Sequence, residues 1–331
     1  AVEIKLDLDE YENFIGKVYV RVIDVAGNTA EAVTDTAQGT TIVKDNANPA
    51  APSFNLNGYQ ADSWTKEDVV ITLSGADTSS GVKVYQYRIE YADTTKQNQG
   101  WTDMPLTTES QVQKAQHEGA AQFVKDKIVI DKDENATYFF RAVSNTGVES
   151  QEVSVFVKIQ KTLPENATET IVTANGNNDW YVVQYPVITI TEPTVSSVAS
   201  PVTTYYKFWD TNKGETEPAD AAKIKFTGDN APVITEDGTY FIKVWTEDEA
   251  GNACALSDII IDEIKVDITD PTNLTIEIND VSVVPEDANT LVFDTFYGET
   301  VTVKLNANCD ISGLASLKYQ KVPTAAQYNE N

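Results

Sequence analysis

The stretch Gly238–Asn252, GTYFIKVWTEDEAGN, decides the fold. Its apolar and polar side chains alternate through Tyr240, Ile242 and Val244, which is typical of a β-strand with one buried face. The stretch ends in DEAGN, where Asp, Gly and Asn break the alternation as turn residues do. It therefore predicts a strand that runs into a tight turn.

The same pattern occurs twice more, as GKVYVRVIDVAGN at Gly16–Asn28 and as ATYFFRAVSNTG at Ala136–Gly147. The glycines of the three turns are 120 and 104 residues apart, and each copy precedes a β-rich run and a proline-containing junction. A period of roughly 100–120 residues with about seven short strands predicts an all-β chain of tandem immunoglobulin-like antiparallel β-sandwiches. The repeated stretch is then strand F, and the run after it is strand G.

This register divides the chain into four segments. Residues 46–161 and 162–268 are expected to be complete domains, residues 1–45 to supply strands E to G, and residues 269–331 to supply strands A to C. Within these halves we expect strand E at Val2–Leu8 and strand C at Leu314–Val322. Each half alone would expose unpaired strand edges. In one alternative, further sequence of a longer array completes these half-domains, and the chain is then expected to be a monomer. In the other, the half-domains of two molecules complete each other head to tail.

Two structural details accompany this register. Glu236-Asp237-Gly238-Thr239-Tyr240 has the form of a tyrosine corner, in which the hydroxyl of Tyr240 bonds back to the backbone between strands E and F. Tyr138 is a looser match to the same pattern. Phe140 and Ile242 stand where antibody domains carry their inter-sheet cysteines, so apolar packing is expected in place of a disulfide.

Composition excludes several classes of function. The 331 residues carry a formal net charge of −27, which opposes binding to nucleic acid or to anionic membranes. No apolar run approaches the roughly 18 residues of a membrane span. His117 is the single histidine, so a paired-histidine zinc site is excluded and a nucleophile–histidine triad has little basis. We therefore expect a protein that is not an enzyme.

Calcium is the one cofactor that the sequence suggests. In tandem sandwiches the E–F loop of one domain and the B–C loop of the next both face the linker, and calcium takes six to eight oxygen ligands. The alternative is that these acids are solvated at loop tips. The candidate ligands lie at the first and third junctions, and they are Asp7, Asp9, Asp45, Asp77, Asp237, Asp267, Asp270 and Asp310.

Aromatic residues suggest a second kind of site. Trp101 lies in the long polar segment Ala92–Gln122, and with Tyr85 and Tyr87 it is a candidate for stacking on a sugar ring. The other tryptophans favour a packing role. Trp64 and Trp180 both precede strand B and are expected to be equivalent, while Trp209 and Trp245 lie in predicted strands.

Short motifs identify a family resemblance. The Asp-x-Ala-Gly-Asn-Thr turn, Ser80-Gly81-Val82 and the YQYR run of Tyr85–Arg88 resemble bacterial immunoglobulin-like repeats of large surface proteins and adhesins. The resemblance implies an extracellular, non-enzymatic stalk segment on the bacterial cell surface, which spaces or presents a distal module and has neighbouring domains of the same kind as partners. The alternatives are a module that binds a glycan or a host protein, and an accessory segment of a secreted glycan-active enzyme.

Overall fold

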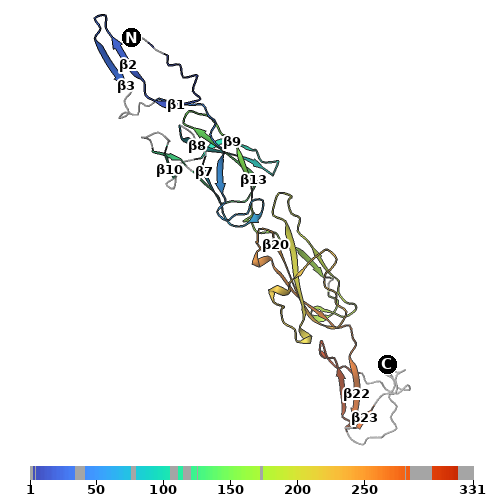
Figure 1. The fold of residues 1–331 in the computed structure, drawn as a ribbon. Helices are drawn as coiled ribbons and strands as arrows, with labels where there is room; N and C mark the ends of the chain where they lie inside the picture. Colours follow the sequence, from blue (N-terminus) through green and yellow to red (C-terminus); the bar gives the residue numbers. More distant parts are fainter. Residues whose placement is uncertain are drawn as a thin grey trace. The chain divides into compact units, whose positions relative to one another are not determined.

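The protein is described here from a computed structural model. The described residues are 3, 5–33, 42–75, 80–104, 111–114, 121–124, 126–171, 174–279, 281–283 and 300–319. Figure 1 shows a chain built of β-strands and connecting loops. It divides into two compact units. Unit 1 comprises residues 1–165, 194–203 and 246–255, and unit 2 comprises residues 166–193, 204–245 and 256–331. Among the described residues, no helix is long and apolar enough to cross a membrane.

The first complete sandwich consists of two sheets. The three-stranded sheet has the order β12-β7-β5, formed by Lys127–Ile130, Val69–Gly75 and Pro52–Asn55. The five-stranded sheet has the order β6-β14-β13-β8-β9, formed by Trp64–Thr65, Val153–Ile159, Glu134–Ser144, Val82–Tyr91 and Gln99–Asp103. All pairs are antiparallel except β6 with β14. This topology is that of an immunoglobulin-like sandwich, as the sequence predicts.

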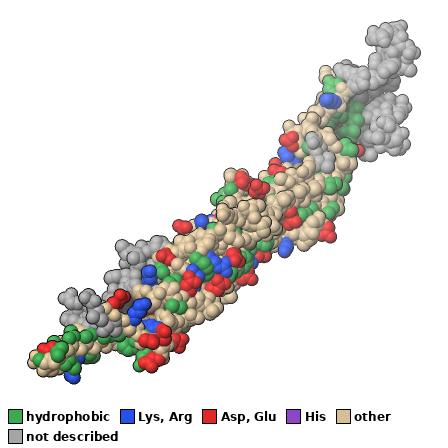
Figure 2. All heavy atoms as spheres, turned by 90° about the horizontal axis from the view of Figure 1, so that it is seen from above, with side chains coloured by type: hydrophobic (Ala, Val, Ile, Leu, Met, Phe, Trp, Pro, Cys, Tyr) green, Lys and Arg blue, Asp and Glu red, His purple; other side chains and the backbone are tan. Residues whose placement is uncertain are grey.

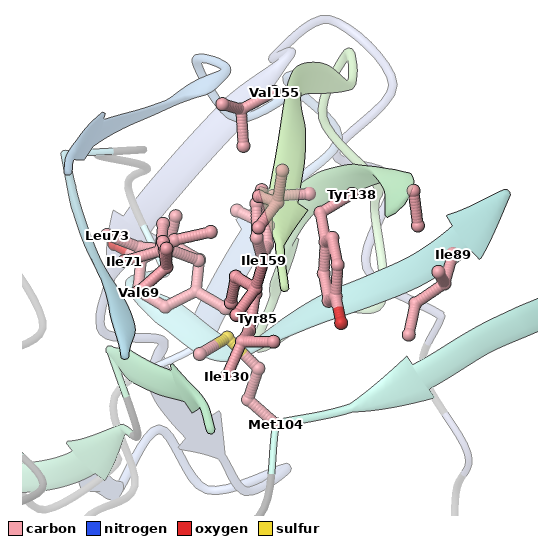
Figure 3. Packing of buried hydrophobic residues seen from close by; sticks show 14 of the residues in the cluster. Val69, Ile71, Leu73, Tyr85, Ile89, Met104, Ile130, Tyr138, Val155 and Ile159 are labelled. Atoms are coloured by element: carbon pink, nitrogen blue, oxygen red, sulfur yellow. The ribbon is translucent and has the colours of Figure 1, made fainter. Parts of the chain in front are cut away.

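Alternation along the strands fills the space between the two sheets. Val69, Ile71 and Leu73 of β7 are at most 1% exposed, and they pack with Tyr138 and Ile159 of the other sheet (Figure 3). Burying one such aliphatic side chain stabilises a fold by roughly 1.5–3 kcal/mol. Phe140 is 0% exposed, as is Ile242 in the next sandwich, so apolar packing does take the place of the inter-sheet disulfide.

The second complete sandwich repeats this arrangement. Its larger sheet has the order β16-β21-β20-β18-β19, formed by Trp180–Tyr181, Ile260–Val266, Gly238–Asp248, Val202–Asp210 and Ile224–Lys225. Its smaller sheet pairs β15, Thr168–Ile171, with β17, Ile188–Thr191. Short 3-10 helices occupy the connections at Asn177–Asp179, Thr211–Lys213, Asp220–Ala222 and Leu256–Asp258. Trp64 and Trp180 are equivalent, because each pairs in parallel with strand G of its own sandwich.

Shorter pairings make up the remaining segments. The N-terminal strands are β1 to β4, at Asn13–Gly16, Tyr19–Ile23, Thr29–Val33 and Ile42–Asp45, with β1 paired to β4 and β2 to β3. In the long polar segment Ala92–Gln122 and just after it, β10 at Gln111–Lys114 pairs with β11 at Ala121–Val124. Near the C-terminus, β22 at Thr272–Ile278 pairs with β23 at Val281–Val283 and β24 at Val303–Asn308.

Two predicted strands are absent from the residues that the structure describes. The described residues of Val2–Leu8 are not in a strand, and neither are residues 314–319 of the predicted strand Leu314–Val322. Both segments alternate in sequence, but among the described residues neither pairs with a neighbouring strand that could satisfy its backbone groups.

Candidate functional site

The buried carboxylate of Asp45 joins the end of β4 to the next sandwich within unit 1. Its Oδ2 accepts hydrogen bonds from Ser80 N at 2.8 Å and from Ser80 Oγ at 2.5 Å. Its backbone oxygen accepts a bond from Thr146 Oγ1 at 2.7 Å. Asp45 is 1% exposed and Ser80 is 3% exposed, so the carboxylate is satisfied away from water.

Gln160 occupies the same position after β14, also within unit 1. Its Oε1 accepts a bond from Ser200 N at 3.3 Å, and its backbone oxygen accepts one from Asn252 Nδ2 at 2.7 Å. Asn252 lies in the F–G turn, as Thr146 does in the preceding sandwich. Ser200 is 2% exposed and its Oγ also accepts a bond from Ala250 N.

Asp267 follows β21 in unit 2 and completes the series. Its Oδ2 accepts bonds from Ser312 N at 3.2 Å and from Cys309 Sγ at 3.3 Å. Burial raises the pKa of Asp267, but the hydrogen bonds from Ser312 and Cys309 outweigh burial and leave this pKa below its ordinary value. The carboxylate is therefore ionised at neutral pH, which strengthens the bonds that it accepts.

The three arrangements are one repeated device, which we call the junction clasp. In each, the residue at the end of strand G accepts a hydrogen bond from a serine two residues before the next segment's Val or Leu. The three pairs are Asp45 with Ser80, Gln160 with Ser200 and Asp267 with Ser312. The Ser80-Gly81-Val82 motif stands out in the sequence, but no role was predicted for its serine.

The strand F turn of the opening stretch is held by its own aspartate. Asp248 accepts bonds from Asn252 N at 2.8 Å and Asn252 Nδ2 at 2.9 Å, and Gly251 has a φ of 88°. Asp24 holds Asn28 in the same way. A positive φ favours glycine, so the turn needs its Asp, Gly and Asn in this order.

The tyrosine corner is present in two forms. Tyr240 Oη donates to the backbone oxygen of Glu236 at 3.0 Å, which confirms the prediction. Tyr138 Oη donates instead to the carboxylate Oε2 of Glu134, also at 3.0 Å. The looser sequence match therefore corresponds to a different acceptor.

The acids proposed for calcium are not gathered around a common point. The described residues contain no group of three or more His, Cys, Asp or Glu side chains placed to hold a metal ion. On the face shown in Figure 2, acidic and basic side chains are interspersed. Calcium binding itself stays a prediction, and Asp77 lies outside the described residues.

Each candidate calcium ligand has its own surroundings. Asp45 and Asp267 belong to clasps, and Asp237 accepts bonds from Ile268 N and Thr269 Oγ1. The remaining four described acids are exposed, and these are Asp7, Asp9, Asp270 and Asp310.

The prediction that Tyr85 and Tyr87 join Trp101 in stacking on a sugar ring was wrong for the two tyrosines. Tyr85 is 0% exposed and its Oη donates to Gly75 O at 2.8 Å, while Tyr87 packs against the same core. Alternate residues of a strand face opposite sides, so Tyr85 and Tyr87 point inward and Gln86 and Arg88 point outward. Trp101 lies on β9 and contacts Arg88 and Arg141 on the outer face of the sheet, not the two tyrosines on the inner face.

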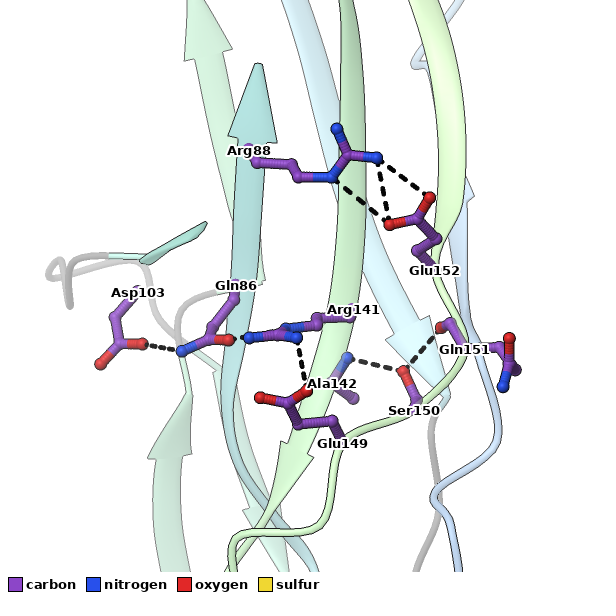
Figure 4. Close-up of polar contacts among 9 residues, drawn as sticks. All are labelled: Gln86, Arg88, Asp103, Arg141, Ala142, Glu149, Ser150, Gln151 and Glu152. Carbon is purple, nitrogen blue, oxygen red and sulfur yellow. Dashed lines mark hydrogen bonds and ion pairs between the residues drawn. The ribbon is translucent and has the colours of Figure 1, made fainter. Parts of the chain in front are cut away.

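Trp101 is half-buried beneath charged side chains. The guanidinium carbon of Arg141 lies 4.2 Å from a ring centroid of Trp101, a cation–π contact. Arg141 also binds Gln86 at 2.8 Å, and the chain of bonds continues to Asp103 and Glu149 (Figure 4). Arg88 forms a separate pair with Glu152 at 3.0 Å. One face of the indole is thus occupied by the protein itself.

Comparison with known proteins found similarity to solved structures alone. No protein-family model matches the sequence, and no curated protein does. A solved structure described as "Structures of Clostridium thermocellum CbhA fibronectin(III)-like modules" is 13% identical, with a TM-score of 0.21 over 65% of this chain and 93% of that chain. At this identity and TM-score the likeness says nothing of function. The assignment to tandem immunoglobulin-like sandwiches rests on the sheet topology of this chain.

Proposed function

We propose that this chain is a non-enzymatic structural segment whose sandwiches are joined by short, hydrogen-bonded junctions, so that it spaces or presents a distal module. The junction clasp carries this proposal. A flexible linker would leave its polar groups in water, whereas Asp45, Ser80 and Ser200 are each at most 3% exposed. Buried and satisfied polar contacts favour one arrangement of the groups that they join.

The finer assignment is to an adhesin-like protein of the bacterial cell surface. It is supported by the resemblance of the Asp-x-Ala-Gly-Asn turn and the Ser-Gly-Val motif to bacterial surface repeats. Two observations favour a structural role for these residues. The turn aspartate binds its own turn, and the motif serine binds the preceding segment. Extracellular location and the absence of catalysis belong to the same proposal.

Single-molecule energy transfer tests the spacer role. Dyes are attached at Val25 and Glu263 through introduced cysteines, in a background with Cys254→Ser and Cys309→Ser. We expect a narrow distribution of transfer efficiency for the otherwise native chain. The double variant Asp45→Ala, Gln160→Ala should broaden it, because each substitution removes a side-chain acceptor from a clasp.

A matched control keeps the test specific. Asp9→Ala, Gln151→Ala makes the same two kinds of change at exposed positions, so the distribution should stay narrow. A native chain with a distribution as broad as that of the clasp variant would contradict the proposal.

A further inference from the structure

A pocket of about 170 Å³ opens in unit 1 beside the start of β13. Glu134 and Asn135 line it from that strand, Asp93 and Lys96 from the turn after β8, and Trp64 from β6. All of its lining residues belong to unit 1. The volume suits a few water molecules or a ligand of a few heavy atoms.

Two of the residues that line this pocket each carry a buried side-chain oxygen without a hydrogen-bond donor. Glu134 is 3% exposed, and its Oε1 has no partner, while its Oε2 is bound by Tyr138. Asn135 Oδ1 has no partner either, because the amide is oriented by the bond from Nδ2 to Val198 O at 2.7 Å. A buried carboxylate with one hydrogen bond is costly, so the pocket favours an occupant that carries both positive charge and donors.

No neighbouring side chain supplies the missing positive charge and donors. Asp133 is itself an acid, and its carboxylate already accepts bonds from Lys161 N and Thr162 N. The ammonium of Lys96 lies over the ring of Tyr91, 5.4 Å from its centroid. The described residues also offer no group of three or more metal-ligating side chains, which favours an N–H donor over a bare metal ion.

The corresponding corner of unit 2 shows which chemistry fits. There a pocket of about 270 Å³ is lined by Glu236 and Tyr240, the counterparts of Glu134 and Tyr138. Lys213 lines it as well, with its Nζ 2.8 Å from Glu236 Oε2 and 3.6 Å from Asp210 Oδ2. In unit 2 the chain itself places a primary ammonium among these acids.

We propose that the pocket of unit 1 binds a small primary amine in its ammonium form, with Glu134 Oε1 and Asn135 Oδ1 as acceptors. The ligand supplies to the buried carboxylate of Glu134 the ammonium that Lys213 supplies to the exposed carboxylate of Glu236. Binding is selective for charge, because a neutral ligand of the same size leaves the buried carboxylate without a counter-charge.

The test is an NMR titration of the whole chain with propylammonium chloride, followed through the indole N–H of Trp64. We expect a saturable shift that 1-propanol does not produce. Glu134→Gln keeps the shape of the side chain but removes its charge, and it should weaken binding at least about tenfold. Glu12→Gln makes the same change at an exposed position and should leave the dissociation constant unchanged.

Two further variants keep the proposal falsifiable. Ala199→Leu narrows the pocket without altering Glu134 and should also weaken binding. Lys96→Met should leave binding unchanged or tighten it. The proposal is overturned if the native chain shows no saturable shift, if only Lys96→Met binds, or if calcium chloride or glucose saturates the Trp64 signal in place of the amine.

Discussion

Gly238 and Ala136 occupy the same position, two residues before the corner tyrosine. A Cβ at Gly238 would lie 3.1 Å from Cε2 of Tyr240, so the ring lies against the glycine and its hydroxyl reaches the Glu236 backbone. Ala136 already carries that Cβ. We attribute to it the changed acceptor of Tyr138, which is the carboxylate of Glu134.

The two corners should therefore differ in stability when the hydroxyl is removed. Tyr240→Phe loses a neutral hydrogen bond, worth about 0.5–1.5 kcal/mol. Tyr138→Phe leaves a buried carboxylate without its donor and should cost about 1.5–3 kcal/mol. Hydrogen exchange of amides in β13 and β20 measures each cost in its own sandwich. Equal losses of protection in the two strands would contradict this account.

Some hydrogen bonds between single residues were predicted from the sequence, and others could not be. The turn of Asp248 and the corner of Tyr240 were predicted because all their partners lie within four residues along the chain. The clasp was missed because Ser80 lies 35 positions from Asp45 and Ser312 lies 45 from Asp267. Contacts over such distances depend on how strands are placed, which a local pattern does not contain.

At the scale of elements, the regularity with which apolar and polar residues alternate along a strand separates the predictions that succeeded from those that failed. Strand F was placed correctly in the two complete sandwiches because its alternation there is long and regular. The first copy of the stretch is instead divided between β1 and β2. Trp101 was assigned to an irregular segment, because β9 is short and polar and gives no clear alternation. Its position beside Arg88 follows only from the pairing of β8 with β9.

Strands β15 and β21 of unit 2 bring two carboxyl groups together, Glu169 and Asp262. Both carboxyl oxygens of Glu169 are buried and have no donor. Burial first, and then the charge of Asp262, raise the pKa of Glu169 from its ordinary value of 4.5 to about 8. Glu169 is therefore protonated in the folded protein at pH values where the unfolded chain has lost the proton.

The stability of unit 2 should fall as the pH rises from about 4.5 to about 8. In this window the folded state holds more protons than the unfolded state, so deprotonation favours unfolding. Glu169→Gln should remove this dependence, because its amide does not titrate. Thermal unfolding across the pH series measures the effect, and Glu263→Gln at an exposed position of the same unit is the control. A variant Glu169→Gln with an unchanged pH profile would contradict the prediction.

At the scale of the whole molecule, the N-terminal strands leave apolar side chains uncovered. Tyr19 is 78% exposed, and Val22 and Ile23 are each 62% exposed, on a ribbon of two strands. An isolated two-stranded ribbon is marginally stable in water. Its faces need a cover, which either a longer chain or a second copy would supply.

We expect the chain to sediment as a monomer at all concentrations, with rapid amide exchange in β2 and β3. Sedimentation velocity over a concentration series measures the first, and exchange of those amides measures the second. Association that grows with concentration and is abolished by Tyr19→Lys, Val22→Lys would instead support completion of one copy by another.

The junction clasp also sets a rule for assembling such chains. Each complete sandwich carries a serine donor before strand C and an acceptor at the end of strand G, as Ser80 and Gln160 show. A copy inserted between two others would bring the half of the clasp that each neighbour requires. Duplication or loss of a repeat therefore preserves the joints, and the order of the repeats is free while their direction is fixed.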